Sequence, residues 1–262
     1  MRETGQAMAE IAGGISSWRI WWMLGQSDIA RRYKRSRLGQ IWMTISMASM
    51  IFGMGLVYST IFKQELGSYL PFLATGIVLW GFIAGCINEG AMAFIESDSI
   101  IRQTDLSKFT YILRVLTRNV LTFAHNFVII PMVLLICGSP ISWTILLFLP
   151  GLVLALLNLS WIAYLLAILS ARFRDIPQII QSVVQIAFFI TPVMFRPHQL
   201  GADHPLLLLN PLAALLSVIR DPLLDIVPTA ASYAIALGMA VLGWLLTLNF
   251  VRRYSRRIVY WL

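Results

Sequence analysis

Six long apolar stretches with hardly a charged residue constrain this chain more than any other feature of its sequence. They run over residues 38–62, 70–87, 119–138, 144–171, 176–195 and 231–251. A helix needs about 20 consecutive apolar residues to cross the hydrocarbon core of a bilayer. Only 12% of the 262 residues are charged, whereas soluble domains carry about 25%. The stretches therefore predict an all-α integral membrane protein with six transmembrane helices.

Residues 196–230, between the fifth and sixth stretches, do not read as a crossing. They contain Pro197, Pro205, Pro211, Pro222 and Pro228. Their apolar part, residues 206–219, is short and is interrupted by Asn210-Pro211. Irregular backbone at membrane depth is tolerated only where protein or water covers it. We therefore expect two short re-entrant helices that enter the membrane from one side.

The basic residues predict the orientation of the chain. With six crossings, 17 of the 20 Lys and Arg residues fall on one side, and only Lys63, Arg196 and Arg220 fall on the other. Cytoplasmic segments carry an excess of Lys and Arg, so both termini are predicted to be cytoplasmic. The same rule accounts for the net charge of +8 without a nucleic-acid partner. The predicted domains are a cytoplasmic N-terminal segment (1–37), a six-span transmembrane domain (38–251) and a cytoplasmic tail (252–262).

The N-terminal segment contains a predicted amphipathic helix over residues 18–33. Indoles and cations recur there near helical spacing: Trp18, Trp21, Trp22, Arg31, Arg32 and Tyr33. Such a helix lies in the plane of the lipid headgroups, with indoles at the interface and cations toward anionic lipid. Two interpretations stay open, a simple membrane anchor and a helix that also contacts a partner protein.

The predicted cytoplasmic loop after the second stretch is polar and carries possible helix caps at Ser97 and Thr104. Its candidate partner-binding residues are Glu96, Ser97, Asp98, Arg102, Asp105 and Lys108. A short helix in this loop could dock into the groove of a partner. A solvated loop without a partner is the alternative.

Signatures of enzymatic and ion-coupled chemistry are absent from the sequence. It has no P-loop, H-E-x-x-H or C-x-x-C motif, so neither a nucleotide site nor a metal site is predicted. Buried carboxylates of the kind that ion-coupled transporters use are scarce. A transporter built in this way would need energy from outside the chain.

Aromatic residues fall inside the apolar stretches as well as at their ends. The candidates for lining a channel are Trp42, Tyr58, Trp80, Phe82, Phe188 and Phe189. Aromatic faces could stack on the sugar rings of a sliding polymer, and core packing is the alternative for each of them.

Several strings in order along the chain resemble one family. They are residues 31–42 (RRYKRSRLGQIW), Arg118-Asn119 with His125-Asn126, residues 171–176 (ARFRDI), residues 190–195 (ITPVMF), and Asn210-Pro211 followed by Arg220. Together they resemble the permease subunits of ABC-type polysaccharide exporters, the O-antigen, capsule and teichoic-acid class. Many members carry a Phe-Pro…Leu-Pro pattern after the second span, and here Lys108-Phe109 and Ile112-Leu113 lack the prolines.

The resemblance implies a homodimer in the bacterial inner membrane, joined to two separate ABC ATPase subunits that bind ATP and Mg. The chain itself would then be no enzyme and would hold no cofactor. Residues 18–33 and 96–108 would contact the ATPase, and Asn210, Pro211 and Arg220 would belong to a periplasmic gate. The expected substrate is a lipid-linked polysaccharide of the O-antigen type, exported through a channel between the two permeases. Export of a drug or a small lipid by the same fold is the alternative, and an integral membrane enzyme is a weaker one.

Overall fold

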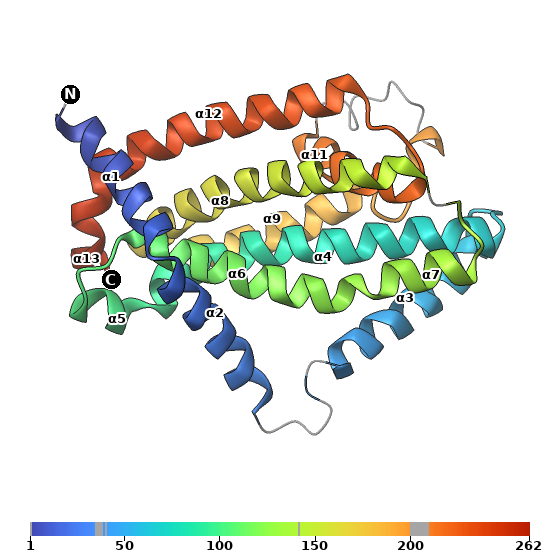
Figure 1. Ribbon diagram of the computed structural model, residues 1–262, viewed down its shortest axis with the longest axis horizontal. Helices are drawn as coiled ribbons and strands as arrows, with labels where there is room; N and C mark the ends of the chain where they lie inside the picture. Colours follow the sequence, from blue (N-terminus) through green and yellow to red (C-terminus); the bar gives the residue numbers. More distant parts are fainter. Residues whose placement is uncertain (1, 35–38, 40, 141, 200–209) are drawn as a thin grey trace.

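The structure is a computed structural model that describes residues 2–34, 39, 41–140, 142–199 and 210–262. All its described regular elements are helices, packed side by side into an elongated bundle (Figure 1). The helices before the middle of the chain are α1 (Arg2–Ser16), α2 (Trp18–Tyr33), α3 (Ile41–Ile61), α4 (Leu66–Glu96), α5 (Asp98–Gln103), α6 (Lys108–Phe127) and α7 (Ile129–Ile136). They are followed by η1 (Trp143–Leu147), α8 (Phe148–Arg172), α9 (Ile176–Ile190), η2 (Pro197–Gln199), α11 (Pro211–Arg220), η3 (Asp221–Leu224), α12 (Ala230–Tyr254), η4 (Ser255–Arg257) and α13 (Ile258–Trp261).

Five described segments are long and apolar enough to cross a membrane. They are Ile41–Ile61, Leu66–Glu96, Lys108–Ile136, Trp143–Arg172 and Ala230–Tyr254. The fifth predicted stretch, residues 176–195, forms only the 15-residue helix α9. A proline disfavours helical backbone at the residue before it, and Thr191 before Pro192 is extended, so the helix ends at Ile190. At 1.5 Å per residue α9 is about 22 Å long, less than the roughly 30 Å of a bilayer core.

Helix α4 is the centre of the bundle. In its most apolar part 83% of the residues are buried, and Leu73, Leu79 and Ile83 have no exposed surface. It packs against α3, α6, α8, α9 and α11. Gly90 lets α8 approach closely, because a Cβ atom there would lie 2.5 Å from the Cβ of Ala163. The apolar run over 70–87 therefore lies at the centre of the core of the bundle.

Helix α3 lies at the opposite extreme of burial. Only 11% of its apolar part is buried, and Figure 1 shows it diverging from the other long helices. It touches α4 through Ile51, Gly55 and Ser59, which recur every four residues and so share one helix face. α3 also contacts α6, where the hydroxyl of Thr44 donates to Oδ1 of Asn126 at 3.2 Å, and most of its remaining surface is exposed.

The third membrane helix begins earlier than the sequence analysis predicts. Its apolar stretch was expected to start near residue 119, whereas α6 starts at Lys108 and is continued by α7. Ser107 caps α6, since its side chain accepts a hydrogen bond from the backbone N–H of Phe109. Arg114 and Arg118, which precede the apolar stretch over 119–138, therefore lie on the first turns of this helix and not in the loop before it.

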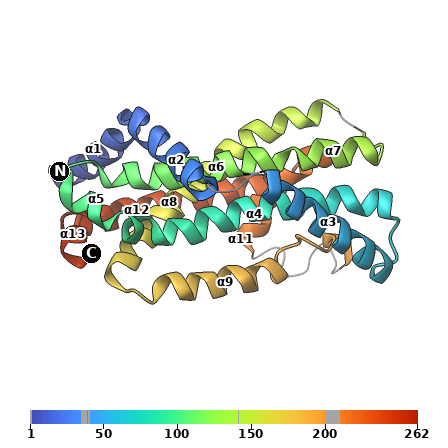
Figure 2. The ribbon, with the colours of Figure 1, turned by 90° about the horizontal axis from the view of Figure 1, so that it is seen from below.

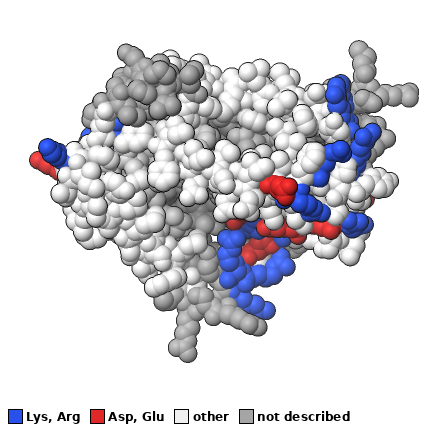
Figure 3. Space-filling model, turned by 180° about the vertical axis from the view of Figure 1, so that it is seen from behind, with Lys and Arg blue, Asp and Glu red and all other residues white. Residues whose placement is uncertain are grey.

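The N-terminal segment is helical from residue 2. The predicted helix over 18–33 is confirmed as α2, with the same bounds, and α1 before it was not expected. The start of α1 and the end of α13 lie at the end of the bundle that also carries α5 (Figure 1). The described Lys and Arg residues also gather toward one end of the molecule (Figure 3).

A short helix pair occupies the opposite end of the bundle. Asn210 and Pro211 start α11, which passes directly into η3. α11 packs against α12, α8 and α4. The other predicted re-entrant helix falls largely on residues 200–209, which lie outside the described residues. Figure 2 shows α9 along one edge of the bundle.

Candidate functional site

Helix α2 is held on α6 by a close approach and an ion pair. A Cβ atom on Gly25 would lie 2.9 Å from Cγ2 of Thr117, so only glycine allows this separation. One turn later, Asp28 accepts hydrogen bonds from Nε and Nη2 of Arg114, each at 2.7 Å. A bidentate pair of this kind fixes both distance and orientation. The N-terminal helix is therefore locked to the third membrane helix.

The charge of Asp28 is maintained although its side chain is only 8% exposed. Burial alone would raise the pKa of this carboxyl group. The hydrogen bonds and charges of Arg114, Arg118 and Arg31 outweigh burial and lower the pKa below its ordinary value of 3.8. Asp28 is thus a carboxylate at neutral pH.

Arg118, one turn after Arg114, extends the ion pair into a cluster. Its guanidinium lies 2.8 Å from Glu89, 3.4 Å from Glu96 and 3.6 Å from Asp28. Glu89 also accepts a hydrogen bond from Nδ2 of Asn119 at 2.7 Å. Arg32 of α2 reaches Glu89 at 3.2 Å. We call Asp28, Arg32, Glu89, Glu96, Arg114 and Arg118 the α2–α4–α6 ion cluster.

The predicted partner-binding residues divide between this cluster and an exposed surface. Glu96 belongs to the cluster, and buried Ser97 accepts a 3.4 Å hydrogen bond from Arg114. The expected short helix is α5, which starts after Ser97. Thr104 ends α5 instead of starting a helix, because its hydroxyl donates to the carbonyl of Ile100.

The exposed part of this region is the outer side of α5. Asp98 and Arg102 form an ion pair one turn apart at 2.6 Å, and Asp105 is exposed after the helix. Lys108 is the first residue of α6, and its backbone N–H donates to Glu10 of α1 at 2.5 Å. Buried Ile101 anchors α5 to the bundle. The terminal helix α13 also packs on α5.

The candidate residues of α2 point in different directions. Trp18 and Trp22 are exposed, and so is Arg31, which pairs with Asp28 at 2.8 Å. Trp21 is half-buried, and its Nε1 has no hydrogen-bond partner among the described residues. The side chain of Tyr33 lies outside what the structure describes. The exposed indoles and the inward Asp28 give α2 one face for its surroundings and one for α6.

The candidate gate residues join α11 to the end of α9. The side-chain oxygen of Asn210 caps α11 at the N–H groups of Leu212 and Ala213, and its Nδ2 donates to Oγ1 of Thr191 at 2.9 Å. Pro211 occupies the first turn, where a missing N–H costs nothing. Arg220 is 3% exposed and donates to the carbonyl of Pro192 at 2.5 Å. Both ends of α11 are thus tied to Thr191-Pro192.

The six candidate aromatic residues do not share one environment. Trp80 and Phe82 lie in the core, 6% and 4% exposed, and Phe82 stacks against Phe123. Tyr58 is half-buried, and half-buried Phe188 contacts Trp80. Trp42 and Phe189 are 57% and 67% exposed.

Sequence reasoning missed most of the ion cluster. Asp28, Glu89, Arg114 and Arg118 were not among the candidate site residues. The signal in the sequence is the spacing of Arg114 and Arg118, which places two cations on one face of α6. Buried arginines require carboxylate partners, and these come from α2 and α4.

Comparison with known proteins gives a family match and several relatives. Residues 19–224 match the family model described as "ABC-2 type transporter". The chain is 27% identical over 203 residues to the "O-antigen export system permease protein RfbA" of Myxococcus xanthus, which covers 74% of this chain and 76% of that protein. It is 23% identical over 204 residues to a protein of the same name from Klebsiella pneumoniae, with 76% and 78% covered. The matched region runs from α2 to η3 and contains the ion cluster, α5 and α11.

Proposed function

The chain belongs to the ABC-2 type transporter family, and we propose from this that it is the membrane-spanning subunit of an ATP-driven exporter of lipid-linked polysaccharide. The substrate class is O-antigen, moved from the cytoplasm to the periplasm. The match of residues 19–224 to the family model carries the proposal, because these residues include the ion cluster, α5 and α11. The relatives named as O-antigen export permeases support the substrate class.

The proposed topology has six crossings in the bacterial inner membrane, with α9 as the fifth crossing and both termini in the cytoplasm. Five long apolar helices support it. The position of both chain ends at the same end of the bundle supports an even number of crossings (Figure 1). α9 is short for a crossing, and Thr191–Phe195 would complete its passage in non-helical form, covered by Tyr69, whose hydroxyl donates to the carbonyl of Met194 at 2.7 Å.

The proposed ATPase contact is the end of the bundle that carries α5, with α2 beside it. α5 offers exposed Arg102 and Asp105, and Ile101 fixes it to the bundle. The ion cluster ties α2 to α4 and α6, so a force applied to either contact reaches the same membrane helices. Two ABC ATPase subunits would dock at this end of the bundle, and they would bind ATP and Mg themselves. The permease chain would supply no cofactor site.

The proposed channel lies between two copies of the chain. The exposed faces of α3 and α9 are the candidates for this interface, since both helices are largely unburied within one subunit. Trp42, Tyr58 and Phe189 are the aromatic residues on these helices that could meet a passing sugar ring. Trp80 and Phe82 would support them from the core, and half-buried Phe188 of α9 packs on Trp80.

The test of this function is depletion of the protein in its native cell, followed by analysis of surface and cytoplasmic glycan. Lipid-linked polymer should accumulate on the cytoplasmic side while surface polysaccharide falls. Unchanged surface polysaccharide would exclude polysaccharide export and favour a drug or small lipid as substrate. Purification from mild detergent separates the enzyme alternative, because an exporter subunit should bring an ATPase with it in about equal amount.

A further inference from the structure

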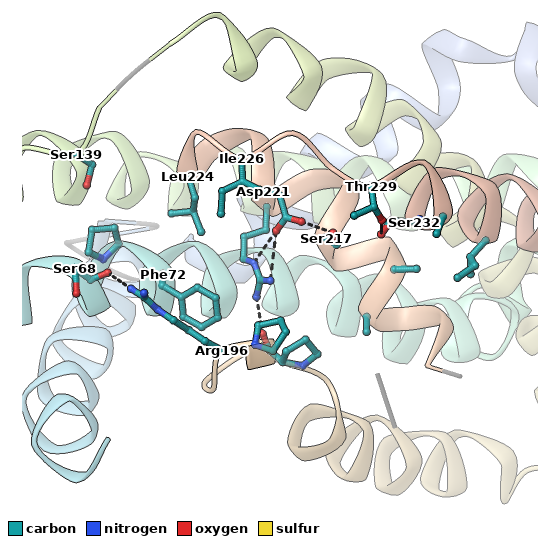
Figure 4. Close-up of a pocket in the computed structure, with 18 of the residues that line it drawn as sticks. Ser68, Phe72, Ser139, Arg196, Ser217, Asp221, Leu224, Ile226, Thr229 and Ser232 are labelled. Atoms are coloured by element: carbon teal, nitrogen blue, oxygen red, sulfur yellow. Dashed lines mark hydrogen bonds and ion pairs between the residues drawn. The ribbon is translucent and has the colours of Figure 1, made fainter. Parts of the chain in front are cut away.

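A cavity of about 750 Å³ opens at the end of the bundle opposite α5. Its walls come from the start of α4, the segment after α7, residues 192–197, α11, η3 and the start of α12. Two of the three cations predicted on the outer side, Arg196 and Arg220, line it. Figure 4 shows Arg196 beside Phe72 and Asp221 near Ser217 in this cavity. A cavity of this size fits a headgroup and part of a chain.

The two arginines share one aromatic ring. The guanidinium carbon of Arg220 lies 4.5 Å from the centre of the Phe72 ring, and that of Arg196 lies 5.5 Å from the same centre. Two like charges this close to one ring repel each other. An anion between or beside them would relieve the repulsion.

Among the described residues that line the cavity, Asp221 is the single carboxylate, and it already has partners within the protein. Asp221 lies 3.4 Å from Arg220 and also accepts a hydrogen bond from the hydroxyl of Ser217. Arg220 in addition donates to the carbonyl of Pro192. Arg220 is therefore both charge-compensated and hydrogen-bonded within the protein.

Arg196 is not compensated in the same way. Its Nη2 donates to the carbonyl of Ser68 at 2.7 Å. Its Nε is buried and has no hydrogen-bond partner among the described residues, and none of the described carboxylates forms an ion pair with it. A buried donor of this kind carries a large desolvation cost unless an acceptor reaches it. The arginine fork suits two oxygens of a phosphoryl group.

The remaining walls of the cavity suit an amphiphile. Phe72, Leu224, Ile226 and Ile235 supply apolar surface. Ser68, Ser139, Thr229 and Ser232 supply hydroxyl groups. A free inorganic anion would use only the polar part and leave the apolar walls wet.

We propose that this cavity binds the phosphoryl group of a membrane lipid, with Arg196 as the principal phosphate contact and the apolar walls around the adjoining chain. The site is independent of which substrate the exporter moves. Its ligand class is an amphiphile with a phosphate monoester or diester at the outer surface of the membrane.

Native mass spectrometry of the detergent-purified protein tests the site with three soluble probes. These are dihexanoyl phosphatidic acid, dihexanoylglycerol with the same chains but no phosphate, and inorganic phosphate. The phosphatidic acid should bind at least about tenfold more tightly than either other probe, because a charge-assisted hydrogen bond and the apolar contacts act together. Equal binding of inorganic phosphate, or of dihexanoylglycerol, would overturn the assignment.

Matched variants locate the binding. Arg196→Gln should weaken binding of the phosphatidic acid about tenfold or more, because the charged fork is lost. Lys63→Gln removes the same charge at the exposed turn between α3 and α4, outside the cavity lining, and should change nothing. Ala231→Leu should also weaken binding while keeping both arginines, since Ala231 is exposed and lines the cavity. Unchanged affinity in both Arg196→Gln and Ala231→Leu, with melting temperatures like that of the parent protein, would reject the site.

Discussion

Asp28 of α2 receives two hydrogen bonds of 2.7 Å from Arg114 of α6, a residue 86 positions later in the chain. Both side chains are nearly buried, at 8% and 11% exposure. A buried ion pair adds little net stability compared with apolar residues of the same size, but removal of one partner leaves an uncompensated charge. The pair therefore fixes where α2 docks on α6. Loss of either Asp28 or Arg114 alone should destabilise the protein more than loss of both.

The first prediction follows from this dependence. Asp28→Asn should destabilise the protein by about 3 kcal/mol, because Arg114 loses its charged partner in a nearly buried site. Thermal unfolding in detergent measures the loss, and limited proteolysis should show faster cleavage in α1 and α2. The matched control is Asp98→Asn, which breaks the exposed pair with Arg102 and should cost about 0.5 kcal/mol or less. The double variant Asp28→Leu with Arg114→Met should recover most of the stability, and a loss larger than that of Asp28→Asn would contradict this account.

A second prediction concerns pH. The pKa of Asp28 is lowered in the folded protein, so its stabilising contribution is complete above the unfolded value of 3.8 and is lost as pH falls through the lower folded value. The stability difference between the parent protein and Asp28→Asn should stay constant from about pH 8 to pH 5 and shrink below about pH 4. Melting temperatures of the two proteins across this range provide the measurement. A difference that shrinks between pH 7 and pH 5 would show that another group governs the docking of α2.

A third prediction compares two glycines of α4. A Cβ atom on Gly76 would lie 2.4 Å from the backbone carbonyl oxygen of Val193, whereas one on Gly81 would meet only Cε of Met47 at 3.7 Å. Gly76→Ala should therefore destabilise the protein by about 2 kcal/mol or more, since backbone cannot move aside as a flexible side chain can. Gly81→Ala should be neutral or stabilising by up to about 1 kcal/mol through helix propensity. Unfolding in a denaturing detergent compares them, and equal stabilities would refute the close packing of α4 on residues 192–194.

A fourth prediction separates the two roles of Asn210. Asn210→Ala removes the cap of α11 and should cost about 1 kcal/mol. Asn210→Asp keeps the capping oxygen but loses the Nδ2 donor to Thr191, so it should retain most of the stability. If α11 forms part of a gate, export should fall in both variants, and a cell-surface polysaccharide assay checks this. Full export with Asn210→Asp would show that the bond to Thr191 has no part in transport.

A fifth prediction addresses the proposed ATPase contact. Arg102→Glu reverses the charge on the exposed side of α5 and should lower recovery of the co-purified ATPase by about tenfold, because like charges across an interface are costly. Folding should be unaffected, since Arg102 is half-exposed and its one ion pair among the described residues is the exposed pair with Asp98. Lys63→Glu, at the opposite end of the bundle, serves as the control. Equal recovery of the ATPase with both variants would place the contact elsewhere.

Hydropathy was enough to predict the long helices, because apolar residues dominate each of them. The bounds of α12 (Ala230–Tyr254) and of the segment Trp143–Arg172 differ from the predicted stretches by only a few residues. The start of α6 was not predictable in this way. Arg114 and Arg118 make its first turns look like a loop, and the carboxylates that neutralise them are distant in sequence. Spacing alone does not reveal such partners.

The candidate site was predicted in part for the same reason. α2 and α5 were recognised from local signals, namely indoles and cations in the first and polar caps in the second. Asp28 and Glu89 become partners of the arginines of α6 only when α2, α4 and α6 pack together, and local sequence does not reveal this packing. The separate environments of Phe82 and Phe189 depend on helix packing in the same way, since both lie in equally apolar sequence.

Helix α4 has residues in both of the polar regions described above. Phe72 lies under the arginines of the outer cavity, and Glu96 holds Arg118 at the other end of the helix. The 24 intervening steps make a rod about 36 Å long at 1.5 Å per residue. A tilt of this rod by about 10° around one end would displace the other by about 6 Å. Because α4 is one continuous helix, a displacement of its Glu96 end and a displacement of its Phe72 end are coupled through the same backbone.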